Sequence, residues 1–213
     1  MTYSIKEMFY TLQGEGLQAG KPAVFCRFTG CNLWTGRESD RAHAICKFCD
    51  TDFVGFDGAL GGKYANAEIL ADRITSLWPI ADEKHRLVVL TGGEPLLQVD
   101  ADLIDALHRR NFSIAVETNG SIKAPHGIDW ICVSPKSGAP LVQTFGDELK
   151  LVYPQPGLMP QALPWDELRF SHYLLQPMDG ADASSNTVAA VAYCQANPKW
   201  RLSIQTHKLL GIP

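Results

Sequence analysis

The sequence predicts an α/β protein with the architecture of an abbreviated, partial (β/α) barrel with mostly parallel strands. Short apolar runs rich in β-formers recur along the 213 residues, several are separated by segments with helical spacing, and polar residues and glycines gather directly after them. Alternating strands and helices favour a parallel sheet. A closed eightfold barrel usually needs about 250 residues. We therefore expect a partial barrel that forms one domain over residues 1–213.

The expected elements follow from local composition and periodicity. Strands are predicted where short runs are apolar, and helices where apolar residues recur every three or four positions. Asn66 is a plausible cap for the first helix, and Pro79 ends it. The predicted strands are 23–28, 86–90, 113–116, 131–133, 149–152, 172–175 and 201–204, and the predicted helices are 66–78, 100–110 and 185–195.

Side chains capable of chemistry follow most of these strands. In parallel α/β architectures, ligands bind at the carboxyl ends of the strands. Glu, Lys, Thr and Gln exceed what turn formation requires, so we expect these segments to converge on one site. The residues concerned include Cys31, Gly93, Glu94, Glu117, Ser134, Lys136, Gln176 and His207.

The composition narrows the possible partners. Hydrophobic residues make up 46% of the chain, charged residues 20%, and the net charge is −4. No apolar run approaches the roughly twenty residues that cross a bilayer, and no basic cluster suggests nucleic-acid binding. No export signal is visible at the N-terminus. We expect a cytoplasmic protein that acts on a small molecule and binds neither nucleic acid nor membrane.

The cysteines divide by context. Cys26, Cys132 and Cys194 lie in apolar sequence and are predicted to pack in the interior. The other three, Cys31, Cys46 and Cys49, have the spacing C-x14-C-x2-C in polar or glycine-flanked sequence.

These three thiols are metal-ligand candidates. A 4Fe-4S cluster is normally held by four thiolates, so three would leave one iron open to an outside ligand. A zinc site completed by His43 or Asp50, or a redox-active dithiol at Cys46 and Cys49, remains possible on spacing alone.

The sequence around these cysteines resembles the cluster loop of radical S-adenosylmethionine (SAM) enzymes. The matching segments are 30–34 and 46–51. Most of that superfamily has C-x3-C-x2-C, whereas here Thr35 stands in place of the second cysteine and residues 35–45 are inserted. The cluster-binding loop is expected at about 30–51. Gly92-Gly93-Glu94-Pro95 resembles the superfamily's motif for the methionine part of SAM, where glycines allow close approach of the backbone.

Further motifs are similar to those of the 7-carboxy-7-deazaguanine synthase family. Residues 7–16 and 25–33 match, and residues 49–51, 117–120 and 134–136 extend the match. The resemblance implies a lyase that converts 6-carboxy-5,6,7,8-tetrahydropterin to 7-carboxy-7-deazaguanine with loss of ammonia. A 5′-deoxyadenosyl radical from SAM would start the ring contraction, and SAM would be regenerated.

The resemblance also implies roles for individual residues. Cys31, Cys46 and Cys49 would bind three irons, and Thr51 would contact Mg²⁺. Residues implied to hold SAM or its surroundings are Phe48, Asp50, Gly93, Glu94, Glu117, Ser134, Pro135, Lys136 and Gln176. Residues implied to bind the pterin are Leu12, Gln13, Gly14, Glu15, Arg27, Thr91, His207 and Pro213. Among these, Arg27 suits the substrate carboxylate, and Glu15 suits the amino edge of the ring.

Two alternatives remain open at this stage. A glycyl-radical activating enzyme would share the cluster and the GGEP motif but has no evident need for Gln13, Glu15 and Arg27. A zinc-stabilised binding domain would need no catalysis. The resemblance further implies a homodimer and an external electron donor such as a flavodoxin or ferredoxin.

Overall fold

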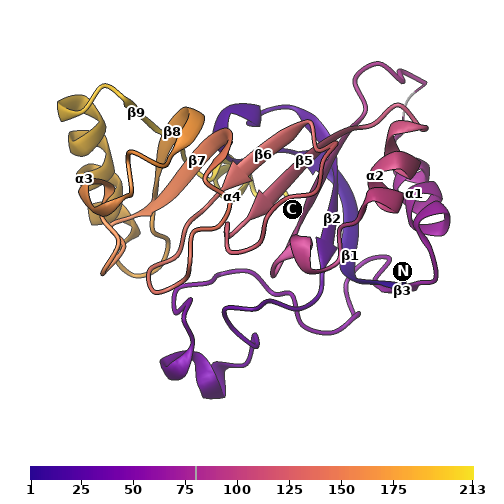
Figure 1. The fold of residues 1–213 in the computed structure, drawn as a ribbon, viewed down its shortest axis with the longest axis horizontal. Coiled ribbons are helices and arrows are strands. Elements are labelled where there is room, and N and C mark those ends of the chain that lie inside the picture. Colours follow the sequence, from indigo (N-terminus) through magenta and orange to yellow (C-terminus); the bar gives the residue numbers. More distant parts are fainter. Residues whose placement is uncertain (80) are drawn as a thin grey trace.

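The structure, a computed structural model, describes residues 1–79 and 81–213 and is organised around one open sheet (Figure 1). In the described residues the sheet has nine strands in the order β3-β1-β2-β4-β5-β6-β7-β8-β9. All neighbouring pairs from β2 to β9 are parallel, and β1 is antiparallel to both of its neighbours. The strands are β1 (Tyr3–Leu12), β2 (Pro22–Phe28), β3 (Gly62–Tyr64), β4 (Leu87–Gly92), β5 (Ser113–Thr118), β6 (Trp130–Val133), β7 (Phe145–Tyr153), β8 (Arg169–Pro177) and β9 (Trp200–Leu202).

The predicted class, α/β with mostly parallel strands, is confirmed. Each predicted strand is present, as are the predicted helices, which form α1 (Ala67–Ser76), α2 (Ala101–His108) and α3 (Ala183–Ala196). The alternation of strand and helix holds only in part, because β5, β6 and β7 follow one another with no described helix between them.

Three elements were not predicted. A register shift between Ile5 and Glu7 interrupts the period-two pattern of β1. For this reason the sequence did not predict a strand there. The edge strand β3 has three residues, and α4 (Thr206–Leu210) has five, too few for either period to be recognised.

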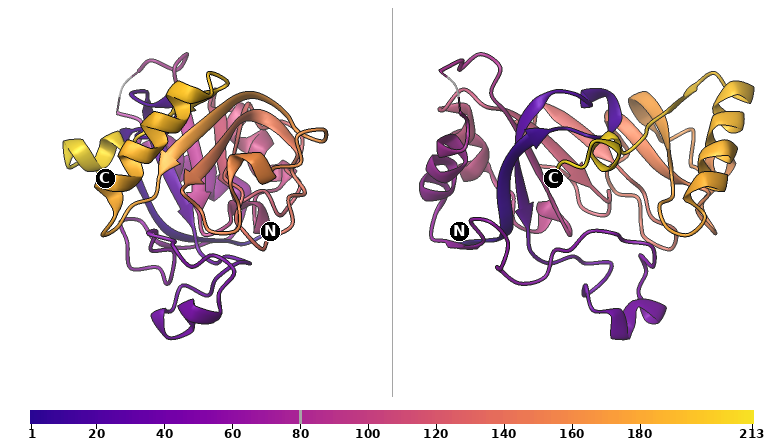
Figure 2. Two further views of the ribbon diagram at one scale, coloured as in Figure 1. Left: turned by 90° about the vertical axis from the view of Figure 1, so that its left-hand side faces the viewer. Right: turned by 180° about the vertical axis from the view of Figure 1, so that it is seen from behind.

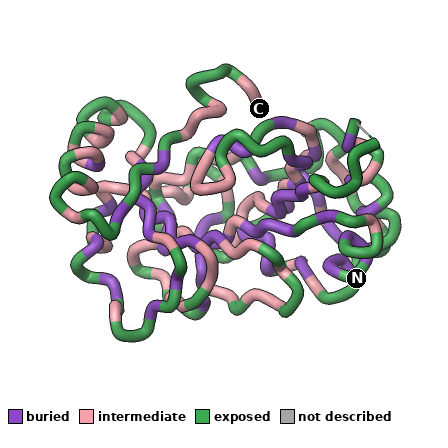
Figure 3. The backbone as a smooth tube through the Cα atoms, turned by 90° about the horizontal axis from the view of Figure 1, so that it is seen from above, coloured by how far each residue is buried: buried purple, intermediate pink, exposed green. Residues whose placement is uncertain are grey.

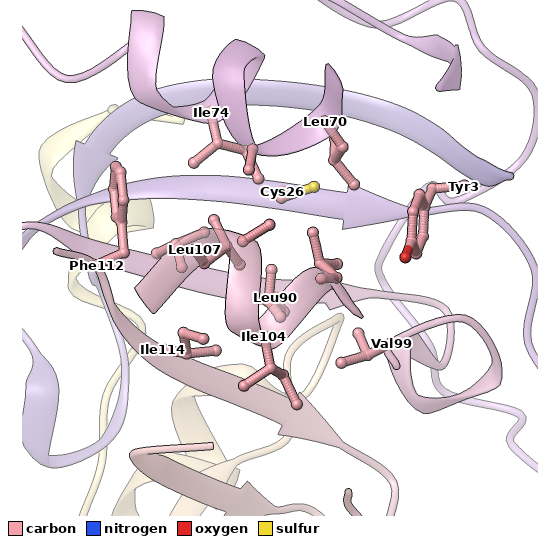
Figure 4. Close-up of a cluster of buried hydrophobic side chains, with 14 of the residues drawn as sticks. Tyr3, Cys26, Leu70, Ile74, Leu90, Val99, Ile104, Leu107, Phe112 and Ile114 are labelled. Carbon is pink, nitrogen blue, oxygen red and sulfur yellow. The ribbon is translucent and has the colours of Figure 1, made fainter. Parts of the chain in front are cut away.

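Helices α1 and α2 cover one face of the N-terminal half of the sheet (Figure 1). As predicted, Asn66 caps α1, with its Oδ1 accepting from the backbone N–H of Ile69 at 3.0 Å. Figure 4 shows Leu70 and Ile74 of α1 directed toward Cys26 of β2, which is fully buried in this core. The expected packing role of Cys26 is therefore confirmed.

A second core lies at the other end of the sheet, where α3 packs on β8 and β9 (Figure 1). Its buried residues include Tyr173, Ala190 and Trp200, and the half-buried Cys194 packs against it as predicted. Buried residues concentrate in the strands, whereas α4 and the residues after it are largely exposed (Figure 3).

The opposite face of the sheet carries a small apolar cluster, Ala23, Leu87, Val89 and Ala115, and also charged side chains. Cys132 of β6 is buried, but it lies among charged groups: its Sγ and carboxylate oxygens of Glu117 and Glu148 are all within 4.8 Å of one another. The predicted burial of Cys132 is therefore confirmed, but its neighbours are charged because alternate residues of β6 face opposite sides of the sheet. None of the described helices has the length and apolarity needed to cross a bilayer.

Candidate active site

The three candidate thiols come from one long connection between β2 and β3, which extends away from the sheet (Figures 1 and 2). Cys31 follows β2, and its Sγ accepts from the backbone N–H of Leu33 at 3.4 Å. The carbonyl of Leu33 in turn accepts from the N–H of Ile45 at 3.1 Å and of Cys46 at 3.3 Å. These bonds return the chain to Cys31 after the inserted residues, so the insertion is compatible with a compact thiol set.

Cys46 and Cys49 share a hydrogen bond. A hydrogen bond between Cys46 and Cys49 lowers the pKa of Cys49 to about 6, although burial opposes this. The same bond, together with burial, raises the pKa of Cys46, while burial raises that of Cys31. Because the thiolate is the form that ligates metal, Cys49 is partly prepared for coordination at neutral pH.

The loop after β4 packs closely against the cysteine loop. A Cβ on Gly93 would lie 2.1 Å from the carbonyl oxygen of Gly30 and 2.8 Å from the Cβ of Cys31. Only glycine permits this approach, since real Cβ atoms do not come so near to backbone atoms. The GGEP segment is thereby held against the first cysteine.

Glu94 is fully buried and does not line the cavity beside it. Its carboxylate accepts from the N–H of Leu96 at 3.0 Å, from the hydroxyl of Thr118 at 2.8 Å and from the N–H of Asn119 at 2.8 Å. Burial raises the pKa of Glu94, and these bonds partly offset the shift. The side chain thus ties the loops that follow β4 and β5 to each other.

A first cavity opens at the carboxyl ends of the parallel strands, beside the cysteines. Segments after β4, β5, β6 and β8 meet there, so the predicted convergence is confirmed. Cys31, Glu94 and Pro135 lie outside its lining. The predicted site residues that line it are Glu15, Cys46, Phe48, Cys49, Asp50, Thr51, Thr91, Gly93, Glu117, Ser134, Lys136 and Gln176.

Lys136 supplies a cation to this cavity. Its Nζ donates to the carbonyl of Ser134 at 2.7 Å and to the Ser134 hydroxyl at 2.6 Å, and it lies 5.8 Å from the ring centre of Phe48. Burial lowers the pKa of Lys136, an effect that nearby thiolates oppose. An ammonium held in this way suits a ligand carboxylate.

A second cavity lies between the β1–β2 connection and the C-terminal segment. Every residue predicted to bind substrate lines it: Leu12, Gln13, Gly14, Glu15, Arg27, Thr91, His207 and Pro213. A Cβ on Gly14 would lie 2.2 Å from Nδ1 of His207, so any larger residue there would displace the His207 side chain. Burial lowers the pKa of His207, which favours the neutral imidazole.

The C-terminal segment closes this second cavity. Both the N–H and the hydroxyl of Thr206 donate to the carbonyl of Gly14 at 2.9 Å, and the hydroxyl of Thr11 donates to the carbonyl of Pro213 at 3.0 Å. Figure 2 shows this segment lying over one face of the sheet. The sequence predicted His207 and Pro213 as site residues but did not predict α4, which contains His207 and precedes Pro213.

Arg27 projects into the second cavity from β2. Its Nε donates to Oε1 of Glu7 at 2.8 Å. Within residues 1–79 and 81–213, no hydrogen bond from either Nη of Arg27 is described, so the paired Nη groups remain suited to a ligand carboxylate.

The two cavities share a wall. Glu15, Asp50, Thr51, Thr91, Glu117 and Gln205 line both of them. A molecule bound in one cavity would therefore meet a molecule bound in the other across these side chains. The wall is the geometric reason that a reaction between two bound molecules is possible here.

Lys150 is the main site residue that sequence reasoning missed. It lies in β7, lines the first cavity and contacts Glu15 and Glu117 of the shared wall. Its signal was present in the sequence Glu148-Leu149-Lys150-Leu151, where charged residues alternate with leucines and so share one face of a strand. Gln205 was likewise not assigned a role.

The donor set fits a 4Fe-4S cluster with SAM. Cys46 and Cys49 border the first cavity, the backbone of Gly93 closely approaches Cys31, and the half-buried ammonium of Lys136 lies on the cavity wall. Thr51 offers a hydroxyl at the boundary between the cavities, where a hard cation such as Mg²⁺ could take an oxygen ligand.

Comparison with known proteins gives consistent results. The chain is 63% identical over 213 residues to a 7-carboxy-7-deazaguanine synthase of Caulobacter vibrioides, with 100% of each chain covered. It is 54% identical over 221 residues to the Nitratidesulfovibrio vulgaris protein of the same name, again with 100% of each covered. The crystal structure of QueE from Escherichia coli matches with a TM-score of 0.68 and 28% identity, covering 96% of this chain and 94% of that one. No family model matches the chain.

Proposed function

We infer that this chain, which belongs to the 7-carboxy-7-deazaguanine synthase family, converts 6-carboxy-5,6,7,8-tetrahydropterin to 7-carboxy-7-deazaguanine with loss of ammonia. It is a radical SAM lyase of 7-deazapurine biosynthesis. The observation that supports the pterin as substrate is the shared wall: a cavity lined by Arg27, Gln13 and Glu15 adjoins the cavity beside the thiols.

The thiols would hold the cofactor. In this proposal residues 1–213 act as one catalytic unit in which the loop at about 30–51 binds the cluster. Cys31, Cys46 and Cys49 would bind three irons and leave the fourth for the amino and carboxylate groups of SAM. When bound, the reduced cluster and SAM supply the 5′-deoxyadenosyl radical that starts the ring contraction.

The remaining predicted residues would orient SAM. Lys136 would pair with its carboxylate, and Gly93 would give its backbone access to the methionine portion. Glu94 would act indirectly, by holding the loops after β4 and β5 in place. The other proposed contacts of SAM are Phe48, Asp50, Glu117, Ser134, Pro135 and Gln176.

The second cavity would hold the pterin. Arg27 would bind its carboxylate through both Nη groups, and Glu15 would accept from its 2-amino edge. Gln13 is fixed for such contacts, since its Oε1 accepts from the N–H of Glu15 at 3.1 Å and its Nε2 donates to Glu117 at 3.2 Å. The other proposed contacts are Leu12, Gly14, Thr91, His207 and Pro213.

Further components of the proposal rest on general chemistry. Thr51 would ligate Mg²⁺ where SAM and the pterin meet, and the substrate and water would supply further oxygen ligands. An external donor such as a flavodoxin or ferredoxin would reduce the cluster, and the enzyme would work as a homodimer. We place it in the cytoplasm, where thiols remain reduced. No specific observation favours glycyl-radical activation or a zinc-stabilised binding domain.

Product formation tests this function directly. The protein would be reconstituted anaerobically with iron and sulfide and supplied with reductant, SAM, Mg²⁺ and the tetrahydropterin, and 7-carboxy-7-deazaguanine would be measured by mass spectrometry. We expect product with the native chain and with Arg201→Ala, an exposed control on β9. Arg27→Ala should keep the cluster and lose turnover. SAM cleavage without this product would show that the substrate is wrong.

A further inference from the structure

Lys150 joins two carboxylates of the shared wall. Its side chain is 4% exposed, and its Nζ lies 2.5 Å from Oε2 of Glu15 and 2.9 Å from Oε2 of Glu117. Glu15 comes from the connection between β1 and β2, Glu117 from the end of β5, and Lys150 from β7. One buried ammonium therefore fixes the relative positions of three separate parts of the chain.

Both carboxylates retain capacity for a ligand. Oε1 of Glu15 accepts from Nε2 of Gln205 at 2.8 Å, and Oε1 of Glu117 accepts from Nε2 of Gln13. A carboxylate offers about four acceptor positions, so each keeps free lone pairs after these protein contacts. Each of the two side chains is 20% exposed, toward cavities that both residues line.

The cluster of Lys150, Glu15 and Glu117 has more negative than positive groups. Two carboxylates share one ammonium in a largely buried setting, and removal of the ammonium would leave two acids side by side. Like charges so placed cannot both remain ionised, and one would take up a proton. A protonated carboxyl presents a donor in place of an acceptor, which would change the ligand that the wall can recognise.

The pKa values of the pair agree with this geometry. Although burial opposes it, the charge of Lys150 and its hydrogen bond lower the pKa of Glu15 to about 2. Burial raises the pKa of Glu117, and Lys150 offsets only part of that shift. Glu15 is thus the member of the pair that Lys150 keeps ionised.

Glu117, Cys132 and Glu148 lie close enough together to hold a metal ion, but their other contacts argue against this role. Ligand atoms of Glu117, Cys132 and Glu148 lie within 4.8 Å of one another. However, Glu148 Oε2 accepts from the N–H of Leu17 at 2.9 Å, and Glu117 is bonded to Lys150 and Gln13. The cation that serves this cluster is the ammonium of Lys150.

We propose that Lys150 is a positioning residue of the pterin site, which holds Glu15 ionised and oriented so that it accepts hydrogen bonds from the 2-amino and N3–H edge of the substrate. This inference rests on the proposed function, because it requires a pterin in the second cavity. It assigns Lys150 to substrate discrimination through Glu15, without contact between Lys150 and the reacting atoms.

A matched pair of ligands tests this role. 6-Carboxypterin carries the 2-amino group, and 6-carboxylumazine carries a carbonyl at that position. Binding of each to the reconstituted, SAM-loaded protein would be measured by fluorescence titration. We expect the native chain to prefer the pterin and Lys150→Met to bind it roughly 10- to 100-fold more weakly, with the preference lost. Lys63→Met, an exposed lysine of β3, is the matched control and should behave as the native chain.

Iron content, thermal unfolding and the effect of SAM on the cluster's electron paramagnetic resonance spectrum would be measured for every variant. Lys150→Arg keeps the charge and should retain most of the preference, which keeps the test valid if Lys150→Met folds poorly. Native-like preference in Lys150→Met, or complete loss in a folded Lys150→Arg, would overturn the inference while leaving the proposed function intact. Failure of the native chain to bind either ligand would overturn the pterin assignment and this inference with it.

Discussion

Lys208 of α4 forms an ion pair with Asp50 in the cysteine loop, with Nζ 2.6 Å from Oδ2. The same Nζ lies 2.5 Å from Oδ2 of Asp179, which follows β8. Asp50 is adjacent to Cys49 in sequence, and His207 beside Lys208 lines the second cavity. The ion pair therefore connects the segment that closes the second cavity to the loop that carries the thiols.

Loss of this connection should loosen the C-terminal segment with little effect on global stability. The Lys208 and Asp50 side chains are 38% and 47% exposed, and such pairs contribute about 0–1 kcal/mol. In Lys208→Met we expect faster hydrogen exchange over residues 206–213, a several-fold higher KM for the pterin and a nearly unchanged kcat. Lys21→Met, an exposed lysine distant from this pair in sequence, is the control. Unchanged exchange in Lys208→Met would refute the connection.

Removal of one proposed ligand should prevent cluster assembly. Cys49→Ala leaves two thiols, too few to hold the cluster with one iron open. We expect iron and sulfide content after reconstitution to fall to near background. Cys194→Ala, which removes a half-buried thiol of α3, should retain full iron content. Equal iron in the two variants would exclude Cys49 as a ligand.

A methyl group on Gly93 should separate the GGEP segment from the cysteine loop. The added Cβ would meet the Gly30 carbonyl at 2.1 Å, so one of the two backbones must move. We expect Gly93→Ala to lose most SAM binding, measured by equilibrium dialysis against the reconstituted protein. Gly20→Ala has no atom within 4 Å of the new methyl but has a positive φ of +86°, so it reports backbone strain without a clash. Comparable SAM binding in both variants would contradict this steric argument.

The Glu15–Lys150 pair should stabilise the fold above acid pH. Because the pKa of Glu15 is lowered from 4.5 to about 2, its contribution is fully present above about pH 4.5 and is lost as pH falls toward 2. Urea unfolding of the cluster-free native chain and Glu15→Gln should differ by on the order of 3 kcal/mol near neutral pH. The difference should be similar near pH 5 and shrink below pH 4.5. A difference that grows on acidification would contradict the assigned direction.

The sequence predicted the framework well where patterns were long. Apolar runs predicted β2 and the strands β4 to β9, and the predicted Asn66 cap marked the start of α1. Prediction failed for β1, because its register shift hides the alternation, and for α4, because five residues show no period. Local sequence patterns could not reveal either element, because each depends on hydrogen bonds to another part of the chain. β1 pairs with β2, and α4 bonds to the connection after β1.

The candidate site divides in the same way. The spacing of Cys31, Cys46 and Cys49 left several kinds of metal or redox site open, and the resemblance of the surrounding motifs to a known family predicted the chemistry and most lining residues. Only the tertiary structure showed that Glu94 is buried away from the cavity and that Lys150 bridges Glu15 and Glu117. The physical reason is that residue types and spacing determine which ligands a chain can bind. Which carboxylate meets a cation, and which is sealed in the interior, depends on the packing of strands that are far apart in sequence.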